Sequence, residues 1–149
     1  MTELTDLRKQ HDDALAMADR LIDLIDGYGG ESDAMPIAVQ FSKLAGLLRV
    51  HFAQEDVLLY PALVASGDRQ IARLALTYVA EMGGLANELE SFAKRWPSSA
   101  VIAGSFPEFA AAARELVLAL AVRIERENRF LYPLAKVNAP QQCDPAWSV

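Results

Sequence analysis

The chain is poor in the residues that build thiolate sites and disulfides. Among 149 residues there is one cysteine, Cys143, and there are only two histidines. A single cysteine excludes a disulfide framework and a cysteine-based metal site within one chain. No uncharged apolar run is long enough to span a bilayer, and the N-terminus is acidic and polar rather than signal-like. These absences predict a soluble, cytoplasmic protein that does not bind membranes.

Basic charge and nucleotide-binding motifs are also missing. The net charge is −6, which argues against a nucleic-acid-binding surface. The chain contains no nucleophile constellation built on serine or cysteine, no phosphate-binding loop and no dinucleotide fingerprint. The sequence therefore gives little support to an enzymatic role. It leaves open a homo-oligomer or a regulatory protein partner.

Strand signals are almost absent, and the chain divides into four long segments with helical periodicity. Four helices of this length joined by short links predict an all-α, antiparallel up-down-up-down four-helix bundle over residues 1–136. Residues 137–149 lack periodicity and are predicted to form an irregular tail. Pro61 and Pro133 are expected to bend or end their helices. The four predicted helices cover residues 4–26, 36–58, 68–95 and 107–130, with a short turn at residues 99–103.

Five ionisable residues lie on helix lines that are otherwise apolar. Steps of three and four residues place these side chains on the inward faces, together with Leu58 and Phe130. Burying a charge costs several kcal/mol unless the group is paired or binds a metal. The five residues therefore predict a polar centre inside the bundle. They are His11, His51, Glu55, Arg123 and Glu127.

One eleven-residue pattern occurs twice, at residues 51–61 and 123–133, with Glu, Leu, Tyr and Pro in identical registers. The chemical difference is at the first position, where His51 is replaced by Arg123. Residues four apart share a helix face, so each copy pairs its first residue with its glutamate. Tyr60 and Tyr132 are expected to seal the ends of the bundle with their hydroxyl groups near water.

These motifs resemble the hemerythrin-like, or HHE cation-binding, domain. The resemblance rests on His11, the His51-xxx-Glu55 pair and the Glu127 motif, and it covers roughly residues 5 to 136. The family is similar in placing a non-haem di-iron site inside a four-helix bundle, with terminal histidines and two bridging carboxylates. The resemblance implies that His11 and His51 serve one iron and that Glu55 and Glu127 are the bridging carboxylates.

The chain departs from this family pattern on one side only. The third motif, usually Glu-His, reads Glu81-Met82, and the fourth, usually His-xxx-Glu, begins with Arg123. Methionine is a poor ligand for the ions that carboxylates favour, and a guanidinium group cannot ligate because it stays protonated. We therefore do not expect a full di-iron centre. His11, His51, Glu55 and Glu127 remain as candidate ligands for one divalent ion, with iron preferred over zinc and manganese.

A metal-free centre is the competing interpretation. Arg123 could form bidentate hydrogen bonds with Glu55 or Glu127 and, with a protonated histidine, balance the charges without a metal. Glu81 lies one step off the inward line and is expected to be solvated, while the glycines at positions 83 and 84 are expected to permit close helix packing.

Three functions follow from these alternatives. We favour a regulatory or interaction bundle whose polar core is metal-free or mononuclear. The alternative is an iron-binding protein that binds or senses oxygen, nitric oxide or iron itself. A mononuclear iron enzyme is the third hypothesis. Fold resemblance alone does not choose among them.

Overall fold

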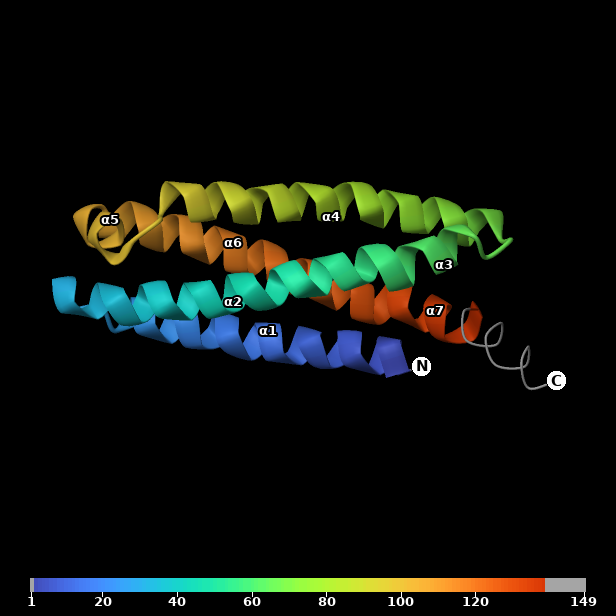
Figure 1. The fold of residues 1–149 in the computed structure, drawn as a ribbon, viewed down its shortest axis with the longest axis horizontal. Helices are drawn as coiled ribbons and strands as arrows, with labels where there is room; N and C mark the ends of the chain where they lie inside the picture. Colours follow the sequence, from blue (N-terminus) through green and yellow to red (C-terminus); the bar gives the residue numbers. More distant parts are fainter. Residues whose placement is uncertain (1, 139–149) are drawn as a thin grey trace.

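Four long helices run antiparallel along the molecule (Figure 1). The computed structural model describes residues 2–138, and no strand occurs among them. The first and third long helices run in one direction and the second and fourth in the other, which confirms the all-α up-down-up-down bundle. These helices are α1 (Thr2–Asp26), α2 (Ala34–Gln54), α4 (Arg69–Arg95) and α6 (Phe106–Arg126).

Shorter elements extend and connect the long helices. α7 ends at Asn138, so residues 137 and 138 are helical rather than irregular, and the rest of the predicted tail, residues 139–149, lies outside the described residues. The predicted domain boundary at residue 136 stays a prediction. The shorter elements are a 3₁₀ turn (Glu31–Asp33), α3 (Tyr60–Val64), α5 (Ser99–Gly104), α7 (Tyr132–Asn138) and two π-helical turns (Glu55–Leu59 and Glu127–Leu131).

Side-chain caps fix where two of the helices begin. The carboxylate Oδ1 of Asp68 accepts hydrogen bonds from the backbone N–H groups of Gln70 at 2.8 Å and Ile71 at 3.2 Å. The hydroxyl of Ser98 accepts one from the N–H of Val101 at 3.3 Å. These bonds satisfy donors that have no partner within the helix. The predicted start of α4 at Asp68 is therefore confirmed.

The two prolines do not end their helices. A proline ring would clash with the carbonyl four residues earlier in a regular α-helix. Here a π-helical turn precedes Pro61 and another precedes Pro133, and the helices continue as α3 and α7. The N–H of Tyr60 donates to the carbonyl of Glu55, five residues earlier. The wider turn accommodates the proline, so of the two predicted outcomes, a bend or an end of the helix, the end was wrong.

The π turns shift each helix register by one residue. Leu58 and Phe130, predicted to face inward, are 42% and 54% exposed. In an α-helix, the residue four positions after the glutamate would share its inward face. After a π turn, the residue five positions after the glutamate takes that place. Tyr60 and Tyr132 consequently turn into the interior, where both are buried with their preceding leucines.

The interior consists of two apolar clusters. The larger one runs from the α5 end toward the middle of the bundle and contains residues such as Leu21, Leu44 and Phe109. The smaller one surrounds the α3 and α7 end and contains Leu7 and Leu63. Each fully buried side chain of this size contributes about 1.5–3 kcal/mol relative to exposure. The buried polar residues belong to neither cluster.

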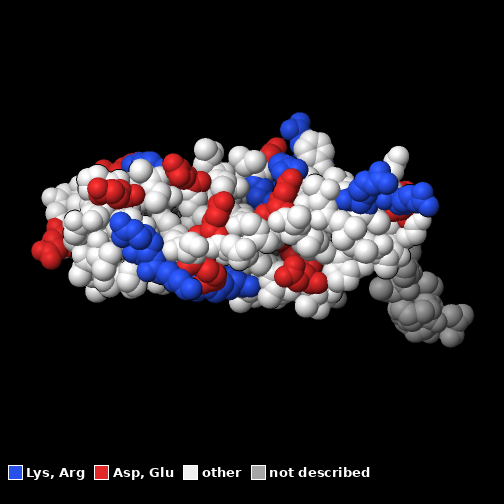
Figure 2. Space-filling view, turned by 90° about the horizontal axis from the view of Figure 1, so that it is seen from above, with Lys and Arg blue, Asp and Glu red and all other residues white. Residues whose placement is uncertain are grey.

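Charges of both signs are interspersed on the surface. Figure 2 shows acidic and basic side chains mixed over the face that it displays. Arg49 on α2 donates two hydrogen bonds to the carboxylate of Glu90 on α4, at 2.7 and 3.0 Å. Within residues 2–138, no helix has the length and apolar character needed to cross a membrane.

Candidate metal centre

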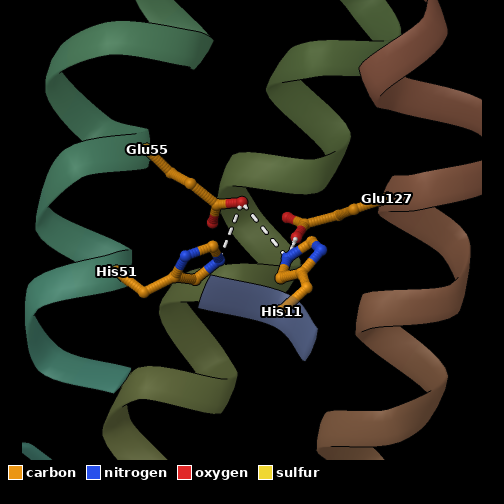
Figure 3. Close-up of side chains that lie close together, drawn as sticks. All are labelled: His11, His51, Glu55 and Glu127. Carbon is orange, nitrogen blue, oxygen red and sulfur yellow. Dashed lines mark hydrogen bonds and ion pairs between the residues drawn. The ribbon is translucent and has the colours of Figure 1, made fainter. Parts of the chain in front are cut away.

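Four of the predicted residues converge inside the bundle. His11 comes from α1, His51 from α2, and Glu55 and Glu127 from the first residues of the two π turns. Figure 3 shows both carboxylates and both imidazoles turned toward one another. One potential ligand atom from each residue lies within 4.8 Å of the others, and all four side chains are at most 3% exposed. The bundle therefore holds two imidazoles and two carboxylates in one enclosed space.

A glutamine orients the ring of His51. Nδ1 of His51 donates to the side-chain oxygen of Gln10 at 2.7 Å, and the amide of Gln10 donates to the side-chain oxygen of Gln54 at 2.7 Å. An amide oxygen only accepts, so Nδ1 of His51 carries the proton. Nε2 then presents its lone pair to the interior, where it lies 3.2 Å from Glu55 Oε2 but has no hydrogen-bond partner among the residues that the structure describes.

Asn128 orients His11 in the same way. Nδ1 of His11 donates to the side-chain oxygen of Asn128 at 2.8 Å. Nε2 therefore faces the cluster, 3.1 Å from Glu127 Oε1 and 3.8 Å from Glu55 Oε2. Both imidazoles thus present Nε2 inward and are held from behind by an amide oxygen, the arrangement that commonly fixes histidine ligands of metals.

Two tyrosines bond to the carboxylates in a crossed pattern. Tyr60 donates to Oε2 of Glu127 at 2.5 Å, and Tyr132 donates to Oε2 of Glu55 at 2.7 Å. The tyrosine of each sequence repeat therefore binds the glutamate of the other repeat. Both phenols are buried, so the expectation that their hydroxyls lie near water was wrong. The π turns cause the difference, because they rotate both rings inward.

The two glutamates differ in their charge state. Burial raises the pKa of Glu55 well above its usual value, and the negative charge of Glu127 raises it further. Burial also opposes ionisation of Glu127, but the adjacent side chains of His11, Glu55 and Tyr60 outweigh this effect and lower the pKa of Glu127. The metal-free pair therefore favours a protonated Glu55 beside an ionised Glu127.

Burial also shifts the pKa values of His51 and of the two tyrosines that contact the cluster. Burial and then the neighbouring His11 lower the pKa of His51 to about 4, so this imidazole is neutral at neutral pH. Burial raises the pKa of Tyr60 and of Tyr132, and the nearby carboxylates add to the effect. Both phenols therefore remain protonated and act as donors.

Arg123 is buried but binds a different partner from the one predicted. Its Nη2 donates to Glu81 Oε1 at 2.9 Å and to the carbonyl of Tyr78 at 3.5 Å. The expected hydrogen bonds to Glu55 or Glu127 do not form, because the guanidinium turns toward α4. Glu81 is not simply solvated either, since it also accepts from Arg126 at 2.6 Å.

Met82 packs in the apolar interior, whereas the two glycines that follow it face open space. Met82 is 4% exposed and belongs to the larger apolar cluster. A Cβ added at Gly83 or Gly84 would meet no atom within 4 Å, so the expectation that these glycines permit close helix packing was wrong. No feature of the described residues explains why two glycines stand here.

The fold and the buried cluster agree with one known family. The model of the hemerythrin HHE cation-binding domain matches residues 2–135. The chain belongs to this family. No curated protein and no solved structure shows a significant match to the chain. The hemerythrin-like domains are metal-binding, and here the residues that could hold a metal are His11, His51, Glu55 and Glu127.

The chemistry and spacing of these residues are compatible with a bound metal ion. Metal bonds to nitrogen and carboxylate oxygen are about 2.0–2.2 Å long, so ligands of one ion lie at most roughly 4.4 Å apart. The four atoms already lie within 4.8 Å of one another. Within residues 2–138, Nε2 of His51 and Oε1 of Glu55 are buried without hydrogen-bond partners, which leaves lone pairs available. Small side-chain movements would therefore suffice to coordinate an ion.

Proposed function

We propose that this hemerythrin-like domain binds one divalent metal ion, preferably iron, through His11, His51, Glu55 and Glu127. We further propose that the domain binds or senses a small ligand at this ion rather than turning over a substrate. The observation that supports binding is the buried, unpaired Nε2 of His51 facing two carboxylates. A buried nitrogen without a partner costs about 1–3 kcal/mol, and a metal bond would remove that cost.

The side chains in and around the cluster explain how the proposed metal site would be oriented, shielded from water and affected by pH. Gln10 and Asn128 fix both imidazole rings, and the enclosed position of the carboxylates excludes bulk water. Two imidazoles with carboxylates are a donor set used by non-haem iron, zinc and manganese proteins. A bound ferrous ion would supply Lewis acidity and redox chemistry. Binding would also displace the proton of Glu55, so affinity should fall in acid.

Arg123 supports one ion rather than two. Its side chain is 6% exposed and carries a fixed positive charge one helical turn before Glu127. At an effective dielectric near 20, a divalent ion about 5 Å from a guanidinium alone is opposed by roughly 6–7 kcal/mol, and the carboxylate of Glu81, paired with Arg123 at 2.9 Å, offsets part of this repulsion. The side of the pocket next to Arg123 is therefore unfavourable for a second ion.

A metal-free regulatory bundle is the second candidate function. The observation that favours it is the crossed pair of hydrogen bonds from Tyr60 and Tyr132, which already occupy one oxygen of each glutamate. Protonation of Glu55 further reduces the charge of the empty centre. Under this alternative, the polar cluster would fix the register of the helices, and a protein partner would bind to the surface of the bundle.

Calorimetric titration separates the two candidates. Chelator-treated protein titrated anaerobically with ferrous ion, and separately with zinc, is expected to bind one equivalent per chain. The His51→Ala variant should bind each ion at least 100-fold more weakly, because one of the two nitrogen ligands is lost. Saturation at two equivalents would contradict the single-ion proposal. Absence of binding to either ion would leave the metal-free bundle as the better account.

A substitution at Gln10 tests whether this residue positions the His51 ring for metal binding. Replacing it by leucine removes the acceptor that holds Nδ1 of His51, so metal affinity is expected to fall about 10–100-fold. Gln40→Leu is the matched control, because Gln40 also bridges α1 and α2 but donates to the Met17 carbonyl at 3.0 Å and does not contact the cluster. Equal affinities in the two variants, measured by competition with a chelating dye, would show that Gln10 does not position His51.

A further inference from the structure

Two surface hollows lie along the seam between α4 and α6. Their volumes are about 390 and 450 Å³, and both include Glu88 in their walls. The smaller hollow is also lined by Gly84 and Val122, and the larger one continues along the same two helices to Trp96. Figure 2 views the molecule from the side of α4, which lies uppermost in Figure 1. We call the two hollows together the α4–α6 groove, and none of the four candidate metal ligands lines it.

Charge is unevenly distributed along this groove. On one side of Gly84, two arginines share a single carboxylate, because Glu81 accepts from Arg123 at 2.9 Å and from Arg126 at 2.6 Å. The side chain of Arg123 is 6% exposed, and its Nη1 has no hydrogen-bond partner within residues 2–138. On the other side of Gly84, the exposed carboxylate of Glu88 has no hydrogen bond or ion pair with any described residue. The groove therefore has excess positive charge at one position and an unpaired negative charge at another.

The middle of the groove is small and apolar. Gly84 lies in the interior of α4, where glycine is less favourable than alanine, yet a Cβ there would meet no atom within 4 Å. Val122 lines the groove and is 50% exposed, and Leu118, four residues earlier on the same face of α6, is 65% exposed. A glycine allows another backbone to approach closely. Nothing within the chain uses that freedom at Gly84, so the groove is suited to a helix from outside the chain.

We propose that the α4–α6 groove is the interface of a homodimer, with the two-fold axis passing near Gly84. Glu81 and Glu88 lie about 4.5 and 6 Å from Gly84 along the helix axis, on opposite sides of it. A two-fold rotation at Gly84 makes the two α4 helices antiparallel. It brings Glu88 of each copy to the pair of arginines, Arg123 and Arg126, of the other.

The order of charges along the groove is the reason that a second copy fits it. A surface that packs on itself across a two-fold axis must place each charge opposite its counterpart after the rotation. The α4–α6 groove meets this condition, because the carboxylate of Glu88 and the excess charge of the arginine pair lie on opposite sides of Gly84. The same rotation covers the exposed side chains of Leu118 and Val122. The inference does not depend on a bound metal.

Sedimentation equilibrium of the chelator-treated full chain tests the proposal. We expect a reversible dimer with a Kd on the order of 10 μM, which weakens as salt screens the ion pairs. Glu88→Arg should weaken dimerisation at least 10-fold, because both symmetry-related pairs become repulsive. Asp19→Arg is the control. It makes the same change in net charge at an exposed position of α1, across the bundle from α4 (Figure 1), and should change the Kd less than threefold.

A second pair of variants tests the close approach at the axis. Gly84→Gln places a neutral side chain where each single chain has open space, so the monomer should fold and melt at the parent temperature or above it. The same side chain would obstruct the antiparallel α4 helices and weaken dimerisation at least 10-fold. Gly46→Gln is the matched control, since Gly46 is also a helical glycine with open space around it but lies in α2, outside both hollows. Circular dichroism would verify the fold of each variant.

The set of variants distinguishes this interface from other arrangements. Losses in both Glu88→Arg and Gly84→Gln, with parent-like controls, are the expected result. A parent chain that stays monomeric up to about 1 mM would overturn the proposal. A dimer that is unchanged in either of the two groove variants, or a loss as large in the matching control, would also overturn it. Glu88→Gln, which removes the ion pairs without repulsion and should cause a smaller loss, replaces Glu88→Arg if that variant folds poorly.

Discussion

Glu127→Gln is expected to lower the affinity for ferrous ion at least 100-fold, equivalent to about 3 kcal/mol. Glu127 is the carboxylate that the metal-free site keeps ionised; it accepts a hydrogen bond from Tyr60 and lies 3.1 Å from Nε2 of His11. Glutamine has nearly the same shape but no negative charge, so it should preserve the fold while removing the stronger anionic ligand. Calorimetry of metal-free protein would give the affinity, and circular dichroism would verify the helix content.

Glu81→Gln is the matched control for this substitution. Glu81 is also a glutamate near Arg123, but its side chain is 40% exposed and does not belong to the four-residue cluster. Its replacement should change iron affinity by less than about fivefold, the scale of a partly exposed charge effect. Parent-like iron binding in Glu127→Gln, or an equal loss in both variants, would remove Glu127 from the ligand set.

The double variant Met82→His with Arg123→His is expected to take up a second iron per chain. Both parent residues are buried, at 4% and 5% exposure, so both new imidazoles would lie in the interior. The pair of changes supplies two nitrogen ligands and removes the charge that opposes a second ion. Either change alone should do much less, because one leaves the guanidinium and the other leaves a ligand missing.

Elemental analysis and absorption spectroscopy would measure this gain. Two irons per chain with the near-ultraviolet charge-transfer absorption of an oxo-bridged ferric pair is the expected result. Met82 lies in the larger apolar cluster, and one turn away Tyr78 is held by its contacts with the two arginines. A double variant that folds normally but binds no more iron than the parent would show that the pocket has been remodelled beyond positions 82 and 123.

Helical periodicity was sufficient to predict the bundle and to bring four distant residues together. The inward line of α1 through Leu7, His11 and Ala14 is buried as predicted, because an unbroken α-helix keeps its 3.6-residue repeat. The same reasoning placed His51, on α2, and Glu55, at the start of the π turn that follows it, on one face. Their assignment as metal ligands remains a proposal.

The inserted π turns are where sequence periodicity failed. One extra residue per turn puts Leu59 and Leu131 on the inward face in place of Leu58 and Phe130, and it brings the next residues, Tyr60 and Tyr132, into the interior. The signal available in the sequence was the proline after each tyrosine, in a helix whose apolar pattern continues beyond it. Proline is compatible with a helix when the preceding turn widens, so a break was not the only possible outcome.

Partners of the cluster outside the apolar lines also escaped prediction. Gln10 and Asn128 flank His11 and Glu127 in the sequence and look like ordinary polar surface residues. Their role depends on which neighbouring helix lies within reach, and that distance is set by packing rather than by periodicity. Glu81 was missed for a related reason, since its long side chain reaches Arg123 from one step off the inward line.

Anomalous X-ray diffraction at the iron edge, from crystals grown with ferrous ion under anaerobic conditions, tests the single-ion site most directly. We predict one anomalous peak per chain, bonded to Nε2 of His11 and His51 and to oxygens of Glu55 and Glu127. Two peaks in the pocket, a peak away from these four residues, or an iron-free pocket in crystals that contain ferrous ion at a concentration well above that of the protein would contradict the proposed function.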